Sequence, residues 1–217
     1  MNSHAGIIIS KIPASEYLSI SHPPLEEITS RYYENILESN KYTSFSKNVS
    51  LFEFFSDSID NFREPTTMLG TIGNISKNST NNISNVGLAV FKKDFLVGEL
   101  SAQETIFNNL ISNKLESCIL TIPNPLYDSE SIDILIKPNK KSKSNINFIN
   151  GNPYISTNIY LKAKIISSTK NSTILNNNYY SKENSYLIEN TCDKYLEKYI
   201  LKYLSQVFSI KYEFSFE

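Results

Sequence analysis

The sequence predicts an α+β protein with a mainly antiparallel sheet and flanking helices, preceded by a small helical region. Residues 86–122 have the pattern of a strand, a tight turn, a second strand, a capped helix and a third strand. Residues 154–167 and 208–217 alternate apolar and polar side chains, as strands with one buried face do. Apolar residues spaced three and four apart predict helices over residues 25–39, 50–62 and 185–206.

Composition limits the classes of function. The chain has 217 residues, of which 40% are hydrophobic, so a packed core is available. The formal net charge of −1 gives no overall attraction to nucleic acid, and we expect no nucleic-acid partner. No segment reaches the roughly 18 apolar residues that a transmembrane helix needs.

The first third of the chain is predicted to be mostly helical. Residues 7–12 are a candidate strand, and Pro23 and Pro24 precede the helix over residues 25–39. Ser50 and Glu53 form a capping box that opens the helix over residues 50–62. We expect this helix to be covered on two sides by its own protein. The alternative is a contact surface for a partner, and the residues concerned are Leu51, Phe52, Phe54, Phe55, Ile59 and Phe62.

A polar, Asn-rich linker is predicted over residues 74–85, after a candidate strand over residues 68–72. The linker has too few apolar side chains to offset the entropy of ordering it. We therefore expect two parts, residues 1–82 as a mostly helical N-terminal region and residues 83–217 as a C-terminal α+β domain.

The second part begins with strands over residues 86–91 and 95–100, joined by a polar turn at residues 92–94. Ser101 and Glu104 form a second capping box, which starts a helix. The strand over residues 117–122 is ended by Pro123 and Pro125. The apolar face of the helix consists of Ile106, Phe107, Leu110, Ile111 and Leu115.

The remaining predicted elements are strands and one long helix. Strands are expected over residues 132–137 and 145–149, with a basic loop between them, and Asn150-Gly151-Asn152 is a hairpin turn leading to the strand over residues 154–167. A polar loop over residues 168–184 precedes the long helix, and residues 208–217 are expected to form the last strand. One face of the strand over residues 154–167 carries Ile155, Ile159, Leu161, Ala163 and Ile165. The buried face of the long helix carries Ile188, Cys192, Tyr195, Leu196, Tyr199, Tyr203 and Val207.

No catalytic, cofactor-binding or metal-binding residue is predicted. Neither histidine, His4 nor His22, lies where a base or a ligand pair can be argued. Cys118 and Cys192 are expected to be buried free thiols, and the sequence does not settle whether they pair. A carboxylate site is conceivable at Asp128, Glu130 and Asp133, although a solvated strand edge is the preferred interpretation.

The basic segment over residues 137–143 is interpreted as a solvated turn. A second interpretation places its lysines near anionic lipid headgroups, which liposome binding would test by neutralising Lys140, Lys141 and Lys143.

Several short motifs in order resemble one known family. They are GLAVFK at 87–92, LVGEL at 96–100, Ser101 with Glu104 and Thr105, and SCILTIP at 117–123. SISHPPLE at 19–26 and VSLFEFF at 49–55 fit the same pattern. Together they resemble the C subunit of spore germinant receptors, the Ger(x)C lipoprotein family, from about residue 7 onward. Cys118 stands where that family usually has a small Gly.

The resemblance implies a non-enzymatic subunit of a nutrient-sensing receptor complex at the outer face of the spore inner membrane. The implied partners are integral-membrane receptor subunits, with no cofactor. Family members begin with a signal peptide, a lipid-modified Cys and a further domain. We expect this chain to lack them and to be soluble by itself. The alternatives are an extracytoplasmic binding module unrelated to germination and, ranked last, a hydrolase using the carboxylates between Asp128 and Asp133.

Overall fold

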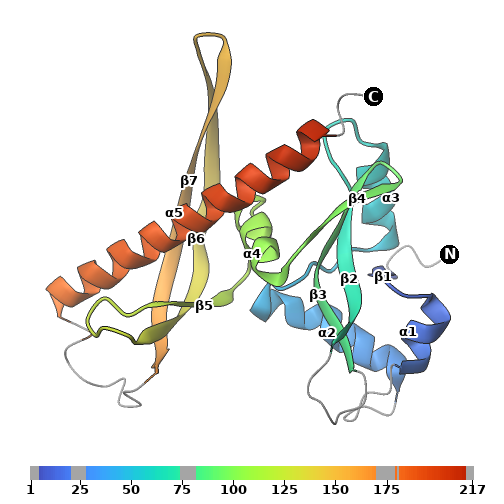
Figure 1. Ribbon diagram of the computed structural model, residues 1–217, viewed down its shortest axis with the longest axis horizontal. Helices are drawn as coiled ribbons and strands as arrows, with labels where there is room; N and C mark the ends of the chain where they lie inside the picture. The colour runs from blue at the N-terminus through green and yellow to red at the C-terminus, as the bar shows by residue number, and fades with distance from the viewer. Residues whose placement is uncertain (1–4, 21–27, 74–81, 170–178, 180, 214–217) are drawn as a thin grey trace. The chain divides into compact units, whose positions relative to one another are not determined.

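The structure is a computed structural model that describes residues 5–20, 28–73, 82–169, 179 and 181–213 (Figure 1). The chain divides into two compact units, Met1–Asn109 and Leu110–Glu217. Each unit contains one sheet, with strand orders β1-β2-β3-β4 and β5-β6-β7. The α+β class is therefore confirmed. Both histidines and residues 74–81 of the expected linker lie outside the described residues.

The first sheet is mixed. β1 (Ile8–Ser10) pairs in parallel with β2 (Thr66–Gly73), which pairs antiparallel with β3 (Asn82–Lys92). β3 and β4 (Phe95–Leu100) form the predicted hairpin, closed by Lys93 in the left-handed conformation. β3 begins four residues earlier than expected, so residues 82–85 of the predicted linker belong to a strand.

Among the residues that the structure describes, four helices precede β5. α2 (Thr29–Thr43), α3 (Leu51–Ile59) and α4 (Ala102–Ile111) were expected, whereas α1 (Ala14–Ile20) was not. Both capping boxes form as predicted. In α3 the Ser50 side chain accepts from the Glu53 N–H, and in α4 the Ser101 N–H donates to Glu104 Oε2 at 2.8 Å. These local signals fixed the starts of two helices because they depend on four consecutive residues.

The core of the first unit lies on its sheet. Leu69, Ala89 and Phe91 are buried, and Phe54 of α3 packs edge-on against Phe91 at a ring-centroid distance of 5.1 Å. α1 contributes the buried Tyr17, whose hydroxyl donates to the side-chain oxygen of Asn85. Phe54 of α3 and Tyr17 of α1 therefore both contribute to the core of this unit.

A bulge in β3 changes the register between its neighbours. Met68 pairs with Leu88 and Gly70 pairs with Asn85, so β3 has an extra residue relative to β2. Gly87 lies in this bulge with φ +88° and donates its N–H to the Phe45 carbonyl at 2.6 Å. The conformation is one that L side chains rarely adopt, so the position requires glycine.

In its described residues, the second unit has a three-stranded antiparallel sheet and one long helix. β5 (Cys118–Pro123) pairs with β6 (Ser131–Ile149), which pairs with β7 (Asn152–Ser168) through the predicted turn at Asn150 and Gly151. α5 (Lys182–Glu213) packs along the sheet (Figure 1). The buried residues of this packing are Cys118, Leu120, Ile122, Ile132, Ile134, Ile136, Ile188, Cys192, Leu196 and Tyr203.

The strand predicted over residues 208–217 is wrong for its described part, because α5 continues through Glu213. The alternating pattern is real, but a strand also needs a neighbour to receive its backbone hydrogen bonds. Extending an existing helix adds one hydrogen bond per residue without a new nucleation step.

The two strands predicted over residues 132–137 and 145–149 are parts of one strand, so the prediction of a basic loop between them is wrong. Residues 137–143 pair with β7, although the register shifts at Pro138/Lys140 and at Lys140/Lys143. Asn113 Oδ1 accepts from the Ser142 N–H at 2.6 Å, which satisfies a donor inside the second irregularity. Bulges thus absorb the proline and the clustered lysines while the ladder continues.

Candidate binding groove between α5 and the second sheet

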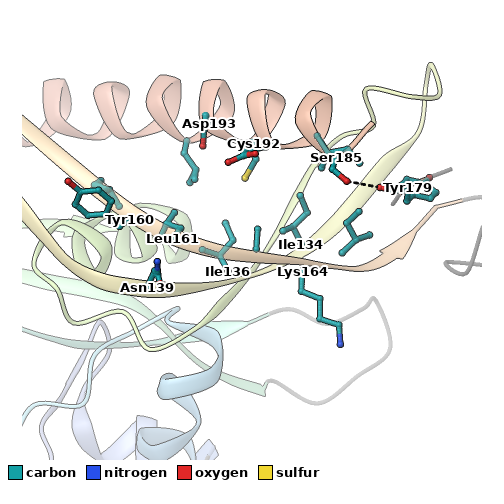
Figure 2. A pocket seen from close by; sticks show the side chains of 16 residues that line it. Ile134, Ile136, Asn139, Tyr160, Leu161, Lys164, Tyr179, Ser185, Cys192 and Asp193 are labelled. Atoms are coloured by element: carbon teal, nitrogen blue, oxygen red, sulfur yellow. Dashed lines mark hydrogen bonds between the residues drawn. The ribbon is translucent and has the colours of Figure 1, made fainter. Parts of the chain in front are cut away.

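α5 and the β6–β7 pair enclose a groove with a volume of about 670 Å³. Figure 2 shows its lining side chains between the helix and the strands. This volume lies within the range of pockets that hold small molecules or single large side chains. The lining residues are Ile134, Ile136, Asn139, Ile159, Tyr160, Leu161, Ala163, Lys164, Ile165, Tyr179, Ser185, Ile188, Glu189, Cys192, Asp193 and Leu196.

The floor and roof of the groove are apolar. Ile134 and Ile136 alternate along β6 and face α5, while Ile188, Cys192 and Leu196 recur every four residues on the facing side of the helix. The strand period of two and the helix period of 3.6 therefore bring two apolar rows together. This packing was predicted for both elements separately, but the space left between them was not.

One end of the groove is held by Tyr179. Its hydroxyl accepts from Asn124 Nδ2 at 3.0 Å and donates to Ser168 Oγ at 3.3 Å. Its backbone carbonyl accepts from Ser185 Oγ at 3.3 Å, the bond drawn in Figure 2. Tyr179 thus links the loop after β5, the end of β7 and the first turn of α5.

The helix side of the groove is acidic. Glu189 and Asp193 lie one turn apart on α5 beside Cys192. Figure 2 shows the Lys164 side chain pointing away from α5, so it does not neutralise them. The groove therefore offers an apolar floor with two carboxylates at its rim, which suits an apolar group that carries a positive charge.

The two cysteines of this unit are free and buried. Burial raises the pKa of Cys118 to about 12. Burial, followed by the charges of Asp193 and Glu189, raises the pKa of Cys192 to about 11. Both thiols therefore stay protonated at neutral pH and act as small apolar groups, which is how the sequence was interpreted.

The carboxylates singled out in the sequence do not line the groove. Asp133 lies opposite Thr121 and Ser167 on the other face of the sheet, where it accepts hydrogen bonds from both hydroxyls. The bond from Ser167, and then that from Thr121, lowers its pKa, so the carboxylate stays ionised.

Glu130 accepts from Ser168 Oγ at 3.4 Å and from Asn124 Nδ2 at 3.5 Å, while Asp128 is exposed in the turn before β6. These contacts tie strand ends together. They do not place an acid and a base on either side of a cleft, as the hydrolase alternative requires.

The prediction that α3 is covered on two sides by the rest of the protein is wrong. None of its residues is buried, and Phe52, Phe55 and Ile59 are exposed, as is Phe62 beyond its end at 96%. Phe54 packs against the sheet, because a helix of nine residues presents one narrow stripe to its neighbour. The other interpretation, a contact surface for a partner, stays a prediction.

The described part of the chain contains no group of three or more His, Cys, Asp or Glu side chains placed to hold a metal ion. Among those same residues, no helix is long and apolar enough to cross a bilayer.

Comparison with known proteins defines the class as a spore germination protein. The family described as "Spore germination B3/GerAC like, C-terminal" matches residues 86–215, more than half of the chain. The chain belongs to this family, as the resemblance implied.

One solved structure, titled "Crystal Structure of the GerBC protein", is similar to 64% of this chain, with 22% identity and a TM-score of 0.42. The aligned part spans 40% of the length of that protein. No curated protein matches the chain.

Proposed function

We propose that this chain acts, without catalysing a reaction, as the C-terminal portion of a germinant receptor C subunit. In this role it binds other receptor subunits at the outer face of the spore inner membrane. The observation that carries the proposal is the family match over residues 86–215, which runs from within β3 through the end of α5.

The groove under α5 is the proposed contact site. Its apolar lining and two rim carboxylates lie in the matched region and are supplied mainly by β6, β7 and α5. A partner segment with an apolar side chain flanked by Lys or Arg complements both features, because the apolar group fills the floor and the cation meets Glu189 and Asp193. The buried, protonated Cys192 adds apolar surface to this site without reactivity.

The test is affinity capture from solubilised spore membranes with residues 1–217 as bait. We expect the integral-membrane receptor subunits to be recovered, with identification by mass spectrometry. Charge reversal at the rim, Glu189→Lys with Asp193→Lys, should reduce their recovery at least ten-fold, since both substitutions oppose the proposed cationic segment.

The matched control reverses two carboxylates elsewhere on α5, Glu183→Lys with Glu197→Lys, neither of which lines the groove. This variant has the same net charge as the rim variant and should retain binding. Capture of no receptor subunit by the wild-type chain would contradict the proposed function. Equal loss in both variants would contradict the groove as the contact site.

A further inference from the structure

The end of the β6–β7 hairpin has an exposed apolar surface. β5 pairs with β6 only over Ser131–Ile136, so the rest of β6 pairs with β7 alone and projects as a two-stranded ribbon (Figure 1). We call the exposed apolar side chains near its turn the tip, and they are Ile146, Phe148, Ile149, Tyr154 and Ile155.

The tip is apolar on both faces of the ribbon. Residues directly opposite each other in an antiparallel pair lie on the same face. Ile146 pairs with Ile155, and Phe148 follows Ile146 by two residues, so these three share one face. Ile149 and Tyr154 belong to the opposite face. A two-faced apolar end suits an apolar medium that surrounds it, whereas docking on a protein layer would use one face.

The rest of the ribbon is basic. Residues 137–164 contain six lysines and no Asp or Glu, although the whole chain has a net charge of −1. All six side chains are exposed, and none forms an ion pair within the described part of the chain. The Lys140 ammonium lies 3.7 Å from the centroid of the Tyr160 ring, in a cation–π contact within the ribbon. The six are Lys137, Lys140, Lys141, Lys143, Lys162 and Lys164.

We infer that this hairpin binds an anionic lipid bilayer, with the tip in the interfacial region and Lys143, followed by Lys140 and Lys141, nearest the phosphate groups. The spacing fits. At about 3.3 Å per residue, Ile146 to Ile149 span about 10 Å, and Lys143 lies about 10 Å further from the turn. The span of about 10 Å from Ile146 to Ile149 matches the interfacial depth of about 5–10 Å that amphipathic membrane-binding segments reach.

Two further physical constraints define the depth. The ribbon has open edges whose unpaired backbone groups cannot enter the hydrocarbon core, so the tip stays in the interface. The long lysine side chains reach back to the phosphates while their methylenes remain near the apolar layer. Attraction to the anionic surface extends over about one Debye length, roughly 10 Å at 0.1 M salt, which includes Lys140 and Lys141.

The experiment uses residues 1–217 and two kinds of vesicle, phosphatidylcholine alone and phosphatidylcholine mixed with phosphatidylglycerol. We expect sedimentation with the anionic vesicles only, decreasing with salt. Replacing Lys140, Lys141 and Lys143 by Gln should weaken binding up to about 100-fold at low salt, since each lysine contributes about five-fold. The matched control replaces Lys194, Lys198 and Lys202 of α5 by Gln and should bind normally.

A fluorescent reporter tests whether the tip enters the interface. The chain has no Trp, so Phe148→Trp gives a single tryptophan that can be excited apart from the tyrosines, and its emission should shift to the blue on anionic vesicles. Phe95→Trp is the matched control, because Phe95 is 71% exposed and Phe148 is 72% exposed, and its emission should not change.

Absence of vesicle binding, equal weakening by both lysine triples, or an unshifted Phe148→Trp spectrum would overturn the inference. The last result is the one expected if the tip instead meets a protein. The inference rests on the hairpin alone. Vesicle binding without receptor capture would retain it and contradict the proposed function, and the reverse result would do the opposite.

Discussion

At the scale of single residues, Gly87 is the position where the backbone leaves least freedom. A Cβ built there would lie 2.3 Å from the Leu100 carbonyl oxygen, and φ is +88°. The close atom belongs to the paired strand β4, so it cannot move aside without breaking the ladder. Gly87→Ala should therefore lower the free energy of unfolding by more than about 2 kcal/mol, measured by urea denaturation.

Gly151 provides the control for this substitution. Its φ is +80°, but a Cβ there would meet no atom within 4 Å. Gly151→Ala should cost only about 1 kcal/mol, the price of a left-handed alanine. Equal costs for the two variants would show that the contact with Leu100 contributes nothing.

The requirement at Gly87 could not be predicted from the sequence. Gly87 is one residue in an apolar run, and the run correctly predicted a strand with Leu88 and Ala89 buried. The bulge arises because Met68 and Gly70 of β2 pair with residues three apart on β3. That register depends on a segment distant in sequence.

At the scale of elements, the start of α4 is fixed by a reciprocal cap. The Glu104 N–H donates to Ser101 Oγ at 3.3 Å, and the Ser101 N–H donates to Glu104 Oε2 at 2.8 Å. Ser101→Ala removes the first bond and should lower the free energy of unfolding by about 1 kcal/mol. Thermal or chemical denaturation measures this loss.

Ser58 is a suitable comparison, since its hydroxyl only donates to the Phe55 carbonyl within α3 and caps no helix. Ser58→Ala should change stability by no more than about 0.5 kcal/mol. A cost for Ser101→Ala that is no larger than this would argue against the cap as a stabilising feature.

The elements also show where local patterns stop being informative. Capping boxes and the Asn150-Gly151 turn were predicted because their bonds join residues close in sequence. The coverage of α3 on two sides was predicted and is wrong, because its apolar side chains specify only that the helix can bury a face. Ile155 was expected on a covered face and is 54% exposed, since β5 ends before the ribbon that carries it.

At the scale of the whole molecule, two buried thiols and a buried tyrosine hydroxyl make the free energy of unfolding depend on pH in the alkaline range. The pKa values of Cys118 and Cys192 are raised from 9.0 to about 12 and about 11. Their contribution is fully present below pH 9 and is lost between pH 9 and about 12, since only the unfolded thiols ionise there. Burial also raises the pKa of Tyr17, with the same sign.

We therefore expect the free energy of unfolding to fall above pH 9, by an amount on the order of a few kcal/mol. Cys118→Ala with Cys192→Ala should be less stable at neutral pH and should show a shallower fall between pH 9 and pH 11. Parallel curves for the two proteins, followed by urea unfolding at each pH, would contradict this assignment.

The order of elements along the chain was enough for the α+β class, but not for the arrangement into two sheets. β4 and β5 are separated only by α4 and a short connection, and nothing in their residues says that they belong to different sheets. The groove could not be predicted from the sequence either, because its lining comes from separate segments, namely β6, β7, Tyr179 and α5. Its sequence signal is confined to the apolar rows of β6 and α5.

The parallel pairing of β1 with β2 has a consequence for the time course of folding. The hairpins β3–β4 and β6–β7 close through two-residue turns, and isolated hairpins form within about 1–10 μs. Ile8 must instead find Met68 across α1, α2 and α3, so the entropy of closing that long loop precedes any gain. β1 is therefore expected to join its sheet late and to be among the first strands released when the native state opens.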